Sequence, residues 1–394
     1  MTLRARSHVV QRATGITLDH VASALESSDR CLVHMAYESG YFSVFWLRSV
    51  DGVALPGHVD VSRLDSRGLL DAMSAWWSAR TIEIRQDALR LALDIAGQGV
   101  AAPLAETLRA AGVKHLVFSP TTLLELLPIH CAPVDGSELL IDVFDNVTYA
   151  PSASVLNMLR SLGPVSSSRF VAIAGDDTAT LPNVVPEIEA FRRAFPSAER
   201  SPRSITPGEA LALCRDANVI HFACHADWLP NNYYGSGLRL KGESLTCARI
   251  LADGDFRRAG LVTLAGCATG ASIGSIDGLR GYAGLDSAFL TRGARSTVAA
   301  QWEIDDLASL LFHQAFYTAL RAGESVQAAY AAGVRCLRKG EYLPQLASAQ
   351  TVATLDQVQP DWRLQLERRE HSFQDVYFWG AFRCSGWTWR AFAK

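Results

Sequence analysis

NVIHFACH (218–225) and GLVTLAGC (260–267) are the two apolar runs that decide how this chain folds. Both are almost continuously apolar, which is typical of strands buried on both faces of a parallel sheet. A short helix is expected between them at residues 247–251, and helical crossovers connect parallel strands. The two runs therefore predict neighbouring parallel strands whose carboxyl ends carry His225 and Cys267.

Strand and helix alternate through the whole second half of the chain, which predicts a mostly parallel sheet covered by helices. Further strands are expected over 167–177, 295–302 and 376–387. The last of these is expected to close the sheet as an edge strand. Helices are expected over 184–195, 206–215, 278–292, 305–322 and 325–339.

The first half of the chain also reads as an α/β module, without an evident catalytic constellation. A hairpin is expected over 30–49, because residues on both sides of Gly40 alternate between apolar and polar. Helices are expected over 67–93 and 103–111, and strand-like segments over 114–120 and 138–159. The expected division is an N-terminal arm at 1–29, an N-terminal half at 30–160 and a C-terminal half at 161–394.

Charge and composition indicate a globular protein whose main ligand is not a polyanion. The net charge is -3, and 49% of the residues are hydrophobic. Without a basic field, direct binding of nucleic acid is not expected. No apolar run approaches the roughly 18 residues of a membrane span, and the N-terminus lacks the apolar core of a secretory signal. A cytoplasmic protein without membrane contact is predicted.

The eight cysteines form no CxxC pair and show no recurring spacing. A disulfide framework or a structural zinc site would need such a pattern, so the thiols fit a reducing compartment. Four of the 37 basic residues are lysines and the rest are arginines. That bias indicates a GC-rich bacterial genome as the source.

His225 and Cys267 are candidates for a catalytic pair, because open α/β sheets bind ligands at the carboxyl ends of their strands. An imidazole beside a thiol shares or takes its proton, which makes the sulfur nucleophilic near neutral pH. The glycine-rich stretch 265–270 would let a substrate backbone come close. The backbone amides of Ala226 and Cys267 could form an oxyanion hole. This chemistry requires neither a metal ion nor an organic cofactor.

Blander interpretations of the same residues stay open. A satisfied core histidine and an inert buried thiol are common roles for these residue types. His221 and Cys224 lie within the first strand and are expected to point into the core or the flanking helices. A metal site of His221, His225 and Cys267 would need a fourth ligand that the sequence does not identify.

Several blocks in a fixed order resemble the CHAT-domain proteases, a family of caspase-like cysteine peptidases. VIHFACHA (219–226), followed some 40 residues later by LVTLAGCATG (261–270), is similar to the family's histidine and cysteine strand ends. The resemblance covers roughly residues 25–390. The other matching blocks are YAPSAS (149–154), SGLRLKGESLTCARIL (236–251), GLDSAFLTRGARSTVAAQWEIDD (284–306) and FWGAFRCSG (378–386).

The resemblance implies a caspase-like three-layer α/β/α sandwich with a mostly parallel sheet, preceded by a diverged pseudo-caspase α/β half. It gives His225 the role of base and Cys267 that of nucleophile. The chain departs from the family pattern at Ala226, which stands where glycine is usual and is followed by Asp227, and at Ala268, where an acid is common. If position 226 requires a positive φ, alanine costs on the order of 1 kcal/mol and tilts the oxyanion donor.

The loop 302–306 follows the strand expected next to the one that ends at Cys267. The resemblance implies that this loop forms the wall of the pocket for the substrate residue immediately before the cleaved bond. Its acids would suit a basic or polar side chain. Asp305 serves equally well as the cap of the following helix. The pocket candidates are Trp302, Glu303, Asp305, Asp306 and, more weakly, Asp277.

The leading hypothesis is an endopeptidase that cuts one or a few protein targets through a thioester intermediate. The resemblance implies a role in bacterial antiphage defence or regulated cell death, with a pore-forming protein as a candidate target. A separate activating protein is expected, because the chain contains no repeats of its own. The alternative is a catalytically silent caspase-like scaffold or interaction module, which Ala226 and Asp227 favour.

Overall fold

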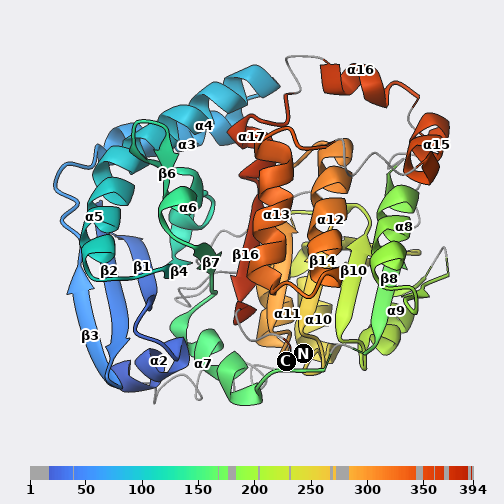
Figure 1. The fold of residues 1–394 in the computed structure, drawn as a ribbon, viewed down its shortest axis with the longest axis horizontal. Coiled ribbons are helices and arrows are strands. Elements are labelled where there is room, and N and C mark those ends of the chain that lie inside the picture. The colour runs from blue at the N-terminus through green and yellow to red at the C-terminus, as the bar shows by residue number, and fades with distance from the viewer. Residues whose placement is uncertain are drawn as a thin grey trace.

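One large sheet runs through both halves of the chain in the computed structural model (Figure 1). The structure describes residues 17–38, 40–166, 168–175, 183–202, 205–229, 232–266, 269–271, 284–342, 349–358, 360–367, 372–388 and 392. From edge to edge the eleven strands are β3 (Val53–His58), β2 (Tyr41–Val50), β1 (Arg30–Glu38), β4 (His115–Pro120), β7 (Asn146–Tyr149), β16 (Phe382–Gly386), β15 (Ser296–Ala300), β14 (Leu261–Leu264), β10 (Val219–Ala223), β8 (Phe170–Ala174) and β9 (Glu199–Arg200).

Most neighbouring strands of this sheet are parallel, as the alternation of strand and helix predicts. Within the sheet, antiparallel pairing is found between β1 and β2, between β2 and β3, and between β15 and β16. The parallel pairs include β10 with β14 and β14 with β15. The mixed α/β architecture with a mostly parallel sheet is therefore confirmed.

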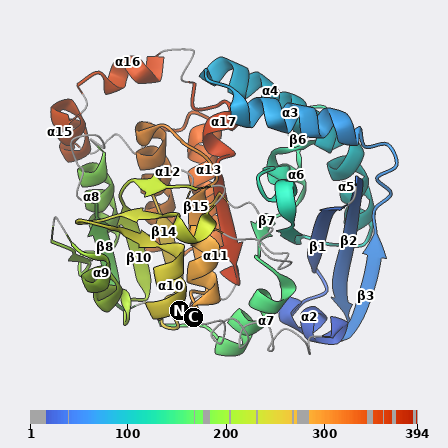
Figure 2. The ribbon, with the colours of Figure 1, turned by 180° about the vertical axis from the view of Figure 1, so that it is seen from behind.

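Helices cover both faces of the C-terminal half of the sheet (Figures 1 and 2). Successive strand residues point to opposite faces, so on β10 Val219 packs in one apolar cluster and Ile220 in another. The first cluster includes side chains of α8 (Val184–Ala194), α12 (Asp306–Arg321) and α13 (Val326–Arg338). The second includes side chains of α9 (Pro207–Cys214), α10 (Cys247–Asp253) and α11 (Leu285–Thr291).

The N-terminal half of the sheet is covered in the same way. On β1, Val33 and Met35 pack in the cluster that includes α3 (Ser66–Ser78), α4 (Ile82–Ala96) and α5 (Ala102–Ala110). Leu32 of β1 and Leu47 of β2 pack instead with α2 (Leu18–Leu25) and α7 (Ala153–Leu162). The expected hairpin of residues 30–49 is confirmed, with Cys31 opposite Arg48 and Glu38 opposite Tyr41.

Smaller elements complete the described chain. They are η1 (Gly97–Ala101), η2 (Thr122–Glu125), η3 (Ile129–Cys131), β5 (Pro133–Asp135), β6 (Glu138–Leu139), α6 (Leu140–Val143), η4 (Tyr233–Gly235), α15 (Ala349–Val358), α16 (Trp362–Glu367), α17 (Val376–Trp379) and the three-stranded sheet β11 (Ala226–Asp227), β12 (Gly237–Arg239) and β13 (Ser244–Thr246).

Two expected helical and strand segments of the first half differ from the structure. The single helix expected over 67–93 is a pair, α3 and α4, because Ala79 and Thr81 have extended backbones. No glycine or proline marks that break in the sequence. The strand-like segment 138–159 contains one main strand, β7, and most of the helix α7. This helix begins just after Ser152, whose hydroxyl accepts a hydrogen bond from the backbone amide of Val155.

The expectation that 376–387 forms an edge strand is wrong. Residues 376–379 form helix α17, and β16 lies in the middle of the sheet, between β15 and β7. Every residue of β16 is buried, which an edge strand would not achieve. Position at the end of the chain suggested an edge, whereas the buried surface on both faces requires a central strand.

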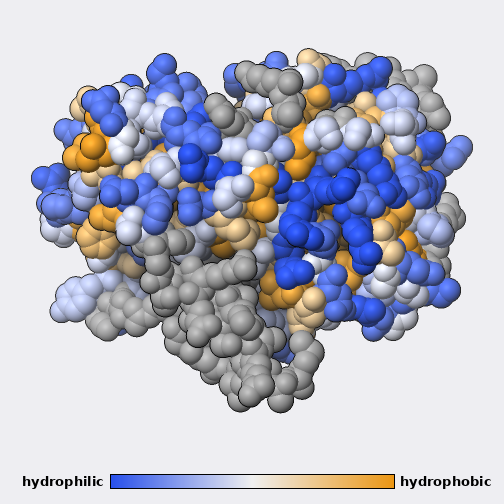
Figure 3. All heavy atoms as spheres, turned by 90° about the horizontal axis from the view of Figure 1, so that it is seen from below, coloured by the Kyte–Doolittle hydropathy of each residue, from blue (hydrophilic) through white to orange (hydrophobic). Residues whose placement is uncertain are grey.

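The described surface seen from below is largely hydrophilic, with apolar residues in small patches between polar ones (Figure 3). Among the residues that the structure describes, no helix combines the length and the apolar character that crossing a membrane requires.

Candidate active site

His225 and the residue before Cys267 lie at the same end of the sheet, just beyond the carboxyl ends of two parallel strands. Strands β10 and β14 are parallel neighbours, with Val219 opposite Leu261 and Phe222 opposite Leu264. The pairing continues past β14, because the amide of Ala265 donates to the Phe222 carbonyl at 2.9 Å. The predicted neighbourhood of the two strands is thus confirmed.

Cys267 and Ala268 lie outside the described residues, but both flanks of this pair are described. A methyl group added to Gly266 would lie 2.7 Å from the Cys224 carbonyl oxygen and 3.2 Å from the Ala226 Cβ. The residue before Cys267 therefore packs against the residues on both sides of His225. A side chain at position 266 would collide with backbone, so this close approach requires glycine.

Beyond this flank, hydrogen bonds hold the chain on the other side of Cys267. The Thr269 hydroxyl donates to the carbonyls of Leu264 and Gly266, at 3.2 and 3.0 Å. The amide of Gly270 donates to the Ala300 carbonyl at the end of β15, at 2.7 Å. The segments before and after Cys267 are thus tied to β14 and to β15.

The backbone of His225 is held by the small sheet of β11, β12 and β13. The His225 carbonyl accepts from the amide of Arg239 at 2.8 Å. One residue later, Ala226 is opposite Leu238. In an antiparallel ladder this makes Ala226 and Leu238 a non-hydrogen-bonded pair, so the Ala226 amide points away from β12. That amide is the one expected at the oxyanion hole.

Alanine at position 226 causes no backbone strain. It lies in β11, and the non-glycine residues with positive φ in the described chain are Glu26 and Asp51. The conditional cost of alanine at this site therefore does not arise. Asp227, the next residue, receives two hydrogen bonds from the Arg239 Nε, at 2.9 and 3.0 Å. Hydrogen bonding from Arg239, together with its positive charge, lowers the pKa of Asp227.

The residues proposed for the pocket wall have different surroundings. Trp302 is 3% exposed; its indole donates to the Tyr377 carbonyl at 3.0 Å and packs edge-on against Trp76. Glu303 has a side chain that is 76% exposed, with the guanidinium of Arg85 at 4.0 Å. Of these two, Glu303 presents its side chain to solvent and Trp302 packs in the core.

The two acids that follow each have a structural partner. Asp305 is the N-cap of α12 and accepts from the amides of Leu307 and Ala308, at 2.8 and 3.2 Å. The Asp306 carboxyl accepts a hydrogen bond from the backbone amide of Asn183 at 2.9 Å, and burial raises the pKa of Asp306 to about 6. Asp277 lies outside the described residues.

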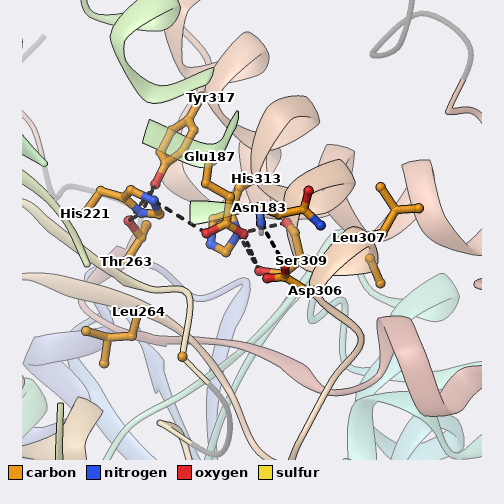
Figure 4. A network of polar contacts seen from close by, with 12 residues as sticks. Asn183, Glu187, His221, Thr263, Leu264, Asp306, Leu307, Ser309, His313 and Tyr317 are labelled. Carbon is orange, nitrogen blue, oxygen red and sulfur yellow. Dashed lines mark hydrogen bonds and ion pairs between the residues drawn. The ribbon is translucent and has the colours of Figure 1, made fainter. Parts of the chain in front are cut away.

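A buried polar network lies beneath the strand ends, between β10, β14 and helices α8 and α12 (Figure 4). The network is not predicted from the sequence, where the available signal was a glutamate, a serine and a histidine on the buried faces of amphipathic helices. Its members are Glu187, His221, Thr263, Ser309, His313 and Tyr317.

His221 belongs to this buried network and not to the candidate site at the carboxyl ends of the strands. Its Nδ1 lies 3.0 Å from the Thr263 hydroxyl and 2.8 Å from the Tyr317 hydroxyl. The expectation that His221 points toward the flanking helices is confirmed. Burial lowers the pKa of His221 well below its usual value, so its ring is neutral.

Glu187 is the acid of the network. It is 2% exposed and accepts a 2.6 Å hydrogen bond from the Ser309 hydroxyl, with His313 Nδ1 at 3.8 Å. Burial raises the pKa of Glu187 well above its usual value, and lowers that of His313 to about 4. The His313 ring is therefore neutral near pH 7, and burial favours the uncharged form of Glu187 as well.

Comparison with known proteins gives a family and a fold. The model of the CHAT domain matches residues 92–387. Two crystal structures of the Saccharomyces cerevisiae separase–securin complex are similar over 93% of this chain and 30% of the separase chain, with TM-scores of 0.57 and 0.54 and 10% identity. This chain thus spans under a third of the separase chain.

More distant similarity is found to gingipain R, the Arg-specific cysteine proteinase, with a TM-score of 0.43 and 7% identity over 80% of this chain and 69% of that one. A search of curated proteins found no match. The caspase-like fold implied by the resemblance is confirmed.

Proposed function

Because the chain belongs to the CHAT domain family, we propose that it is a cysteine endopeptidase with Cys267 as nucleophile and His225 as base. The observation that supports this most is the packing of Gly266 against Cys224 and Ala226, the two neighbours of His225. It places the residue before the thiol beside the residues that flank the imidazole.

The reaction follows the chemistry of a thiol and an imidazole. His225 takes the Sγ proton, and the thiolate attacks the carbonyl carbon of the scissile peptide bond. The amide of Ala226, which points away from β12, supports the negative oxygen with that of Cys267. The C–N bond breaks as His225 returns the proton to the leaving amine. Water, deprotonated by His225, then hydrolyses the thioester and restores the thiol.

We propose a protein substrate with a basic or polar residue before the cut, recognised by the loop 302–306. Glu303 supports this most, because its carboxylate is exposed while Asp305 caps α12 and Asp306 is tied to Asn183. We propose further that the protein acts in the bacterial cytoplasm, in defence or regulated cell death. A pore-forming protein is a candidate substrate, and a separate protein is proposed as the activator. The yeast separase was crystallised with a protein partner, securin.

The test is a peptide that carries a thiol-reactive group after an arginine, applied to the wild type, to Cys267→Ala and to His225→Ala. Cys224→Ala is the matched control, since Cys224 is a buried free thiol next to His225. Labelling that needs Cys267 and His225 but not Cys224 is expected. Labelling that persists in Cys267→Ala, or that is absent from the wild type even with a protein activator, would instead favour the silent scaffold.

A further inference from the structure

Arg383 is a fully buried arginine in the middle of the sheet. It lies on β16 and is 0% exposed. Its neighbour Phe382 stacks on Phe312 of α12, with ring centroids 3.8 Å apart. Since successive strand residues point to opposite faces, Arg383 faces away from α12. Burial lowers the pKa of Arg383 to about 9, and the guanidinium is still charged near neutral pH.

The guanidinium of Arg383 joins two distant parts of the chain. Its Nη2 donates to the Gly270 carbonyl at 2.8 Å, and its Nη1 donates to the Glu125 carbonyl at 3.0 Å. Gly270 comes three residues after Cys267, and Glu125 ends η2 in the N-terminal half. The side chain thus spans the two halves and ends on the segment that carries the thiol.

Neighbouring groups hold the Arg383 guanidinium and the Glu125 carbonyl in place. The Asp286 carboxyl of α11 lies 3.6 Å from Nη2, and the Tyr149 ring lies beneath the guanidinium, 5.1 Å from its central carbon. The Gln301 amide donates to the same Glu125 carbonyl at 3.0 Å. The planar fork of arginine suits such a bridge, because it points two rigid donors in fixed directions.

We propose that Arg383 is a positioning residue, which ties the segment carrying Cys267 to the N-terminal half and so sets the reactivity of the thiol. The proposal rests on the proposed cysteine-peptidase function. It gives the N-terminal half a part in the reaction without any group of that half touching the substrate. A lysine has one point charge and reaches one carbonyl at a time, so Arg383→Lys breaks the bridge and keeps the charge.

The chain offers a matched control in Arg295, which is 3% exposed. It also bridges two distant segments through carbonyls, since its Nη2 donates to Leu162, at the end of α7, at 3.2 Å and its Nη1 to Arg257 at 3.1 Å. Arg295 lies one residue before β15. Gly270 is hydrogen-bonded to Ala300, at the opposite end of the same strand. Arg295→Lys therefore disturbs the same type of contact far from the thiol.

The experiment compares the two lysine variants with the wild type, each well below its melting temperature. For the peptide probe we expect the maximal rate of Cys267 labelling to fall at least 10-fold in Arg383→Lys, with unchanged half-saturation, and to stay within 2-fold in Arg295→Lys. Hydrogen exchange at residues 269–271 should be faster in Arg383→Lys and unchanged in Arg295→Lys.

The outcomes separate this inference from the proposed function. If Cys267 of the wild type is not labelled, the peptidase proposal is wrong. Hydrogen exchange at residues 269–271 still tests whether Arg383 holds the Gly270 segment. Equal labelling of a folded Arg383→Lys and the wild type overturns the positioning role, as does unchanged exchange at 269–271. An equal loss of labelling in both variants overturns it too, since that would be a general effect of stability.

Discussion

At the scale of single residues, the surroundings of His225 argue for a strand that is built to hold it. Ala226 is extended, and Asp227 pairs with Arg239, whose own amide holds the His225 carbonyl. Ala226 and Asp227, the residues that favour the silent scaffold in the sequence, therefore support the backbone at the histidine. They no longer favour the silent scaffold over the enzyme.

Restoring the usual glycine should consequently bring no gain. Ala226→Gly is expected to lower the free energy of unfolding by about 0.5–1 kcal/mol, because glycine loses more backbone entropy on folding into a strand. The rate of labelling by the peptide probe should stay within 2-fold of the wild type. Urea denaturation and probe kinetics check the two parts. A several-fold faster reaction would mean that alanine does obstruct the oxyanion donor.

Asp306 should make the stability depend on pH. Its pKa in the folded chain is about 6, above the ordinary value of 3.8. The folded state therefore binds the proton more tightly, and the stabilisation is full below pH 3.8 and lost as the pH rises through 6. Relative to Asp306→Asn, which can still accept from the Asn183 amide, the wild type should lose about 2 kcal/mol between pH 4.5 and 7.5.

The measurement is denaturation of both proteins across that pH range. The difference between the two unfolding free energies should change with pH, while each alone also reflects other groups. A difference that is flat from pH 4.5 to 7.5 would show that Asp306 is ionised throughout.

At the scale of elements, the network around Glu187 joins β10 and β14 to α8 and α12 by buried polar side chains, and burial favours the uncharged form of Glu187. Glu187→Gln preserves an acceptor for Ser309 and is expected to cost less than about 1 kcal/mol at pH 7. Glu187→Leu leaves the Ser309 hydroxyl without this acceptor in the interior and should cost about 1–3 kcal/mol. Equilibrium denaturation at pH 7 measures both. A glutamine variant as damaging as leucine would indicate an ionised Glu187 that interacts with a charged histidine.

The elements also show what the sequence could and could not predict. The apolar runs ending at His225 and Cys267 were recognisable as parallel neighbours, because burial on both faces leaves a continuous apolar pattern. The central place of β16 was not, since the order of strands in a sheet depends on which surfaces pair in three dimensions. The same holds for Arg383 and Glu187, whose hydrogen-bond partners come from segments more than 100 residues away.

At the scale of the whole molecule, the two halves share one sheet and one set of side-chain contacts. Strand β16 of the C-terminal half lies beside β7, with Ser385 opposite Tyr149. On the side of α3, Trp76 packs against Trp302, and Trp77 packs against Trp228, three residues after His225. The N-terminal half thus contacts both loops that the proposed site requires.

We therefore expect that residues 161–394 do not fold stably without residues 1–160. Removing the first part would turn β16 into an open edge and expose Trp302, and unpaired apolar edges aggregate. The separate fragment should be insoluble or lack a cooperative unfolding transition, and coexpression with residues 1–160 should restore a soluble complex that the peptide probe labels. Gel filtration, thermal unfolding and labelling check this. A stable fragment that reacts at the wild-type rate would show that the C-terminal half needs neither β7 nor the bridge through Arg383.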